Sequence, residues 1–187
     1  QSRSSAASDV YKRQHLTIQF VEKLKEEYSV DLIPILVGEE NPDALHEPDL
    51  YEKYCLEDVK RISPYYGVDF NGDSYPEKSL VNKANSILAA TEPNNFIQIA
   101  KKVSTHLWNN DEEELSMLQK QFNSSMSKVS EVLSEGNKIR NDCDYYFGSA
   151  FYYEKELYWG VDRLNYLEDR LTELGAKKSP SNESLAP

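Results

Sequence analysis

The stretch "ELYWGVDRLNYLEDRL" (residues 156–171) changes character at Gly160. Before this glycine, aromatic residues crowd into two short runs on either side of Glu154-Lys155, which predicts a β-hairpin over 145–160. The turn contains neither Gly nor Asn, so its type stays open. After Gly160 the apolar residues follow a helical period and predict an amphipathic helix that ends at Gly175. These apolar residues are Val161, Leu164, Leu167, Leu171 and Leu174.

A helix and a strand are predicted near the other end of the chain. Residues 15–28 place Leu16, Phe20 and Leu24 on one helical face. The run "VDLIPILVG" (30–38) is short, apolar and β-branched, and predicts a buried strand that ends at Gly38. A helix followed by a strand forms the second half of a βαβ unit, so another strand should precede the helix.

The N-terminal residues do not supply that strand. The segment "SSAASDVYKRQ" (4–14) has no apolar period and no signal-peptide core. It resembles a segment that recurs at the ends of translated environmental sequences. We therefore expect residues 1–14 to be a non-native segment and the first β-strand to be missing.

Helical patterns fill the middle of the chain. Leu50, Tyr54, Val59 and Ile62 recur at helical intervals, and further helical patterns run from Pro76 to about Gly136. The element order predicts an α/β, thioredoxin-like fold with a core at 15–38 and 145–176 and an all-helical insertion at 39–144. Residues 177–187 are expected to form a disordered tail. The missing strand is central in this fold, so its absence should leave unpaired strand edges.

Composition excludes several classes of partner. The 187 residues carry a formal net charge of -11, which argues against nonspecific binding to nucleic acid or to an anionic membrane surface. No apolar run approaches the roughly 20 residues needed to cross a bilayer. Cys55 and Cys143 lie far apart without metal spacing, which favours idle thiols in a reducing, cytoplasmic setting over a redox pair. The three histidines are scattered and no metal site is expected.

Two segments resemble a known family. The first is Trp159-Gly160-Val161-Asp162-Arg163, an aromatic-Gly-x-Asp-Arg motif. The second is "KYCLEDVKRISPYYGVDF", whose matching residues are Lys53, Tyr54, Asp58, Arg61, Tyr66, Gly67 and Val68. Together, in this order over about residues 15–176, they resemble the DsbA-like thioredoxin-fold family. The similar branch holds 2-hydroxychromene-2-carboxylate isomerases and kappa-class glutathione transferases.

The resemblance implies a site for glutathione. In the family, the turn matching Gly160, Val161, Asp162 and Arg163 holds the γ-glutamyl end of glutathione. A helix start suits this role, because its N–H groups can receive a carboxylate while an aspartate pairs with the ammonium. Ser149 stands near the family's cis-proline position. Lys53 and Tyr54 are implied to lie near the cleft, although an exposed lysine is the ordinary case.

The same resemblance leaves the catalytic residue unknown. The family's catalytic Ser or Cys lies at the start of the first helix, where this chain has "VYKRQ". The chain as given should therefore be inactive, whereas its parent would be a glutathione-dependent isomerase or transferase acting on a small molecule. Two alternatives stay open, a thiol–disulfide oxidoreductase and a noncatalytic binding protein. Asp162 can also simply stabilise the helix start, without binding a ligand. The oligomeric state is not predicted, and a homodimer stays open.

Overall fold

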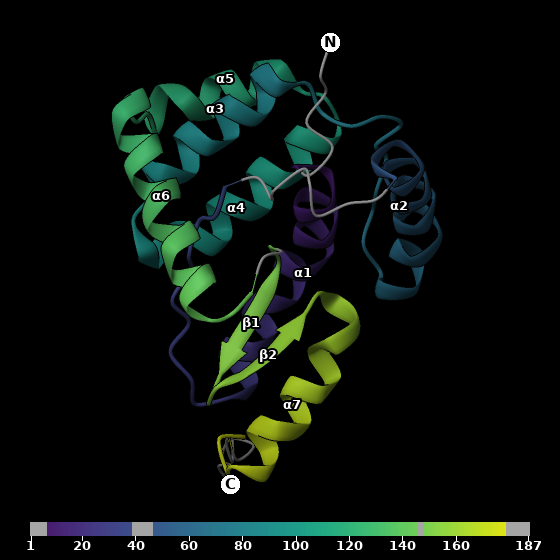
Figure 1. Cartoon of the computed structure of the whole chain (residues 1–187), viewed down its shortest axis with the longest axis vertical. Helices are drawn as coiled ribbons and strands as arrows, with labels where there is room; N and C mark the ends of the chain where they lie inside the picture. The colour runs from purple at the N-terminus through teal and green to yellow at the C-terminus, as the bar shows by residue number, and fades with distance from the viewer. Residues whose placement is uncertain (1–6, 39–46, 146–147, 179–187) are drawn as a thin grey trace, which may run out of the picture.

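The computed structural model describes residues 7–38, 47–145 and 148–178, and these form a mixed α/β structure that is mostly helical (Figure 1). The described residues contain one sheet, which has two antiparallel strands. The larger elements are α1 (Ala7–Glu27), α2 (Pro48–Ile62), α3 (Lys78–Ala89), α4 (Pro93–Trp108), α5 (Glu112–Gln121), α6 (Met126–Asp142), β1 (Ala150–Tyr153), β2 (Glu156–Trp159) and α7 (Leu164–Glu173). Two short 3₁₀ helices complete the set, η2 (Ser63–Tyr66) and η3 (Val161–Arg163).

Helix α1 lies against most of the other elements. It packs on α4, α2 and η3, and its Leu24 belongs to the cluster formed with the hairpin and α7. Leu16 and Leu24 are each only 1% exposed, as their predicted place on one helical face requires. The helix begins at Ala7, eight residues before the predicted start, so it runs through part of the segment that the sequence interpretation had set aside.

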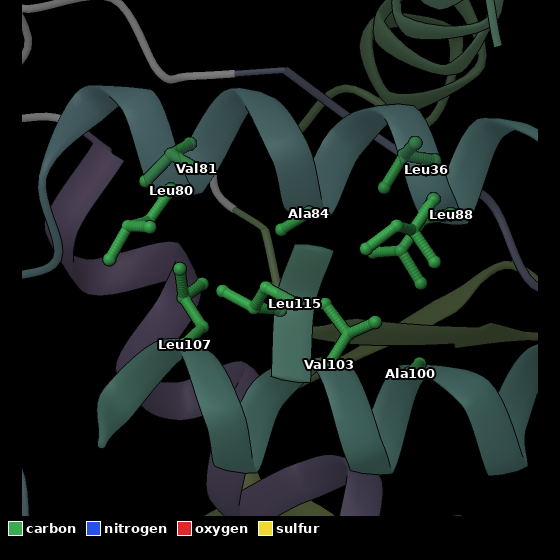
Figure 2. Packing of buried hydrophobic residues seen from close by; sticks show 10 residues of the cluster. Leu36, Leu80, Val81, Ala84, Leu88, Ala100, Val103, Leu107 and Leu115 are labelled. Atoms are coloured by element: carbon green, nitrogen blue, oxygen red, sulfur yellow. The ribbon is translucent and has the colours of Figure 1, made fainter. Parts of the chain in front are cut away.

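Helices α3, α4, α5 and α6 form a helical unit with a core of its own. Figure 2 shows Leu80, Val81 and Leu88 of α3 facing Val103 and Leu107 of α4, with Leu115 of α5 between them. Leu115 and Ile87 are fully buried. Leu36, from the segment after α1, also enters this core and so ties that segment to the helical unit.

The buried face of α2 differs from the predicted one. Tyr54 and Leu50 were expected on the apolar stripe, but they are 59% and 66% exposed. Val59, which was on the predicted stripe, is buried, and so is Cys55, which was not. Cys55 and Val59 have the same four-residue spacing as Leu50 and Tyr54, so periodicity alone could not choose between the two faces.

The hairpin and the helix after it are confirmed. Ala150 pairs with Trp159 and Tyr153 with Glu156, around the predicted turn at Glu154-Lys155. The two turn residues have φ values of 48° and 67°, which identifies a two-residue turn of type I′ built without glycine. In α7, Leu164, Leu167 and Leu171 are buried as predicted. Leu174 is instead half exposed, beyond the end of the helix.

Two other predictions are wrong. Residues 30–38 form no strand. They run as extended chain with Ile33 81% exposed, and the described residues offer this segment no strand partner. The tail was expected to be disordered from residue 177, but Lys177 forms an antiparallel bridge with Tyr28, and the Lys178 N–H donates to the Glu27 carbonyl. Residues 179–187 lie outside the described residues.

The hairpin turn yields a stability prediction. A left-handed backbone costs an L-residue about 1 kcal/mol and costs glycine almost nothing. Replacing Lys155 (Lys155→Gly) should therefore raise the free energy of unfolding by about 1 kcal/mol. Urea denaturation followed by circular dichroism measures the change. Lys155→Ala removes the same charge but keeps a Cβ, so it should give no such gain, and equal effects of the two changes would contradict the turn geometry.

Candidate functional site

Gly160 joins the hairpin to the C-terminal helix. Its φ of 75° with an extended ψ lies in a region that glycine adopts without steric cost. Its N–H donates to the carbonyl of Ser149 at 2.9 Å, which fixes the corner between β2 and the following 3₁₀ turn. The chain then makes the 3₁₀ turn η3 and enters α7. This places Val161 inside and leaves Asp162 and Arg163 on the surface.

The two segments that carry the family resemblance meet around α1. Val161, Leu16 and Val59 form a buried cluster against which Tyr66 packs. Tyr66 ends η2, and its ring meets the ring of Phe20 in a T-shaped contact with centroids 5.7 Å apart. The structure thus brings the Tyr-Gly-Val segment and the Gly-x-Asp-Arg turn together, although about 90 residues separate them in the sequence.

A hollow of about 320 Å³ lies at this junction and is called here the anchor hollow. Its lining comes from α1, η2, η3 and α7. The residues are Phe20, Lys23, Tyr66, Val161, Asp162, Leu164, Asn165 and Glu168. It therefore combines aromatic walls with carboxylates and one ammonium group. Sequence reasoning found Asp162, Val161 and Tyr66 but missed Phe20, Lys23 and Glu168, because only the folded chain brings α1 beside α7.

The charges of the anchor hollow interact. Lys23 Nζ lies 3.4 Å from Glu168 Oε1, and this carboxylate raises the pKa of the lysine. Burial raises the pKa of Tyr66, and the nearby negative charge of Asp162 raises it further. Arg163 lies over the ring of Tyr166 and donates to the Asp162 carbonyl, while Asp58 pairs with Arg61.

The remaining sequence-predicted residues do not join the anchor hollow. Ser149 contacts Gly160 through its backbone, but it lines a different cavity. Lys53 is exposed on α2, as is Tyr54, and neither lines either of the two cavities described here. Their predicted place near the cleft stays a prediction.

The second cavity is larger, at about 460 Å³, and is called here the trench. It lies between residues 30–37 and β1, with α1 and α7 contributing apolar side chains and α6 contributing Ile139 and Arg140. Figure 1 shows the purple chain after α1 running beside β1 in the opposite direction. The sequence predicted unpaired edges here but not the contribution of α6.

The part of the chain that the structure describes contains no group of three or more His, Cys, Asp or Glu side chains that could hold a metal ion. Neither cysteine forms a disulfide bond; Cys55 is buried in α2 and Cys143 is half-buried just after α6. No helix among the described residues is long and apolar enough to cross a membrane. Comparison with models of protein families finds no match, and no curated protein sequence matches the chain.

His15 of α1 is buried against α4 and the chain around residue 69. Its Nε2 lies 3.2 Å from the Asp69 carbonyl, which can only accept, so Nε2 carries the proton. Nδ1 then accepts from the Ser104 hydroxyl at 2.9 Å. The two hydrogen bonds fix the orientation of the imidazole ring. Burial lowers the pKa of His15 below 6.5, although the Asp69 bond opposes the shift. The residue therefore has a structural role.

The buried histidine predicts a pH dependence of stability. The unfolded chain binds a proton at His15 at a higher pH than the folded chain does, so protonation favours unfolding. The stabilisation is complete above pH 6.5 and is lost as the pH falls through that value toward the lowered folded pKa. His15→Gln should remove this part of the decline in unfolding free energy between pH 7.5 and 5.5, measured by urea denaturation. A matched His106→Gln variant should keep it, and an unchanged decline in His15→Gln would contradict the prediction.

Proposed function

We propose that this chain carries the glutathione-anchoring part of a thioredoxin-like protein. In this proposal the hairpin, α1 and α7 belong to the thioredoxin-like core, the helices between them are an insertion, and the first strand of the core is missing. The parent protein would be a glutathione-dependent isomerase or transferase acting on a small molecule. The observation that carries the proposal is the meeting of Asp162 and Tyr66 at the anchor hollow, where two distant motif segments converge.

The chemistry of the anchor hollow suits the γ-glutamyl end of glutathione. That end carries an ammonium and a carboxylate on the same carbon. Asp162 offers an anion for the ammonium, while Lys23 and the start of the 3₁₀ turn offer a cation and N–H donors for the carboxylate. Phe20 and Tyr66 form a rigid aromatic wall beside these groups. A zwitterionic ligand matches this set better than a simple anion does, because Glu168 and Asp162 would repel one.

The proposal for this chain is binding without turnover. The reacting Ser or Cys of the family stands at the start of the first helix, whereas α1 begins with Ala7-Ser8-Asp9-Val10, which matches neither a Ser-Pro-Tyr-like nor a Cys-x-x-Cys segment. Thiol–disulfide exchange would need a reactive cysteine at the same place. Cys55 is instead buried within α2 and Cys143 follows α6, so neither cysteine favours that alternative.

Titration calorimetry with reduced glutathione tests the proposal. The chain should bind glutathione with one-to-one stoichiometry, and Asp162→Asn should weaken binding about tenfold, because it removes one charge-assisted contact. Asp169→Asn, at an exposed position of the following helix α7, should leave affinity unchanged. Cysteinylglycine, which lacks the γ-glutamyl group, should not bind. Equal affinity in the two variants, or no binding of glutathione at all, would contradict the proposal.

A further inference from the structure

Two extended segments, β1 and residues 30–37, form the long walls of the trench. In an antiparallel pair, alternate residues exchange hydrogen bonds with the partner strand and the others point away. The bond from Gly160 to Ser149 sets this alternation, so Ala150 and Tyr152 direct their N–H and C=O groups away from β2. Residues 30–37 form no backbone hydrogen bond with another segment among the described residues. The trench is therefore an elongated space between two segments that share no ladder.

The two ends of the trench belong to different cores. At one end Leu24 and Val30 pack in the cluster around α7, to which Leu171 also belongs. At the other end Ile18 packs against the core of the helical unit, which Leu36 also enters. The volume of about 460 Å³ lies within the range of small-molecule sites. An elongated space with apolar side chains at both ends fits a chain-like aliphatic molecule.

Thr17 is a polar residue in this apolar lining. It lies in the same stripe of α1 as Val21 and Leu24, at intervals of four and seven residues, and all three line the trench. The residue is only 6% exposed, and its hydroxyl has no hydrogen-bond partner among the described residues. A buried hydroxyl without a partner is destabilising, because it has lost the water that bound it in the unfolded chain.

The usual local partner of a helical threonine does not satisfy Thr17. The chain's other three threonines, Thr91, Thr105 and Thr172, each donate to the carbonyl four residues earlier. The carbonyl four residues before Thr17 also lies within α1, yet the hydroxyl makes no bond to it. Thr17 therefore keeps its hydrogen-bonding capacity at the trench, where a ligand can use it.

The charges around the trench favour a neutral ligand. Asp31 and Arg140 are the only acidic or basic residues that line it. Asp31 is exposed, and Arg140 donates to the Gly38 carbonyl, which fastens residues 30–37 to α6. The chain's net charge of -11 disfavours an anion. Because burial of any charge carries a desolvation penalty, a neutral polar group suits an apolar space of this kind best.

We propose that the trench binds a neutral, extended aliphatic alcohol whose hydroxyl group exchanges a hydrogen bond with Thr17. The aliphatic chain would lie between β1 and residues 30–37 and cover the apolar side chains of α1 and α7. Binding is noncovalent. No residue lines both the trench and the anchor hollow, so this site goes beyond the proposed glutathione site and does not depend on it.

An NMR titration of the isotope-labelled chain with straight-chain 1-alkanols tests the site. 1-Octanol should bind with one-to-one stoichiometry and shift the amide signals of β1, of residues 30–37 and of Thr17. Affinity should rise about fourfold with each methylene from 1-hexanol onward and stop rising once the chain fills the trench. Octanoate and octylammonium should bind at least tenfold more weakly than 1-octanol, because each must bury a charge.

Thr17→Val tests the hydrogen bond, because valine keeps the shape of threonine and removes the hydroxyl. This variant should bind 1-octanol about tenfold more weakly than the parent. Its melting temperature without ligand should not fall, since the lost hydroxyl has no partner in the described chain, so poor folding cannot explain the loss. Thr105→Val, which removes an exposed hydroxyl bonded to Lys101, should bind 1-octanol as the parent does.

Several results would overturn the proposal. Absence of 1-octanol binding would show that the trench is not such a site. Equal affinity in Thr17→Val and the parent would show apolar adhesion alone, as would an affinity that never levels off with chain length. Octanoate binding as tightly as 1-octanol would contradict the neutral ligand. Asp162→Asn should leave 1-octanol binding unchanged, so failure of this site and failure of the glutathione site are distinguishable.

Discussion

Backbone N–H and C=O groups must find partners when they leave water, and this requirement governs the structure around the trench. The chain after α1 runs extended beside β1, yet the described residues form no ladder between the two. Each side is held in place by other elements: β1 by β2 and α7, and residues 30–37 by α6 and by the insertion of Leu36 into the core of the helical unit. The cavity between them has a largely apolar lining.

Helix α1 contributes side chains both to the trench and to the anchor hollow, the candidate ligand site. Leu24 packs with the hairpin and α7, while Leu16 packs with α2 and η3. Ile18 and Val21 face the trench, and Phe20 and Lys23 face the anchor hollow. A change that shifts α1 would therefore alter both cavities, although separate residues line them. The anchor hollow is assembled from four elements and depends on this helix for two of its lining residues.

The sequence predicted local secondary structure better than it predicted strand pairing and contacts between distant elements. Aromatic runs predicted the hairpin, and the period after Gly160 predicted the buried face of α7. The run at 30–38 was wrongly predicted as a strand, because a β-branched segment becomes one only when a partner is present. On α2 the sequence predicted both Val59 and Tyr54 on the apolar stripe, and only the fold shows that Val59 is buried while Tyr54 is exposed. The place of Asp162 at the candidate site was predicted from a local motif, whereas that of Lys23 depends on contacts between α1 and α7, which are distant in the sequence.

Amide hydrogen exchange on the 187-residue chain, followed by NMR, tests the central claim most directly. The account predicts alternation along β1, with the Phe151 and Tyr153 amides protected by β2 and the Ala150 and Tyr152 amides exchanging far faster. The amides of residues 30–37, apart from proline, should exchange fast as well. If Ala150, Tyr152 and residues 30–37 were protected as strongly as Phe151, these two walls would already be paired, and the account of the trench would be contradicted.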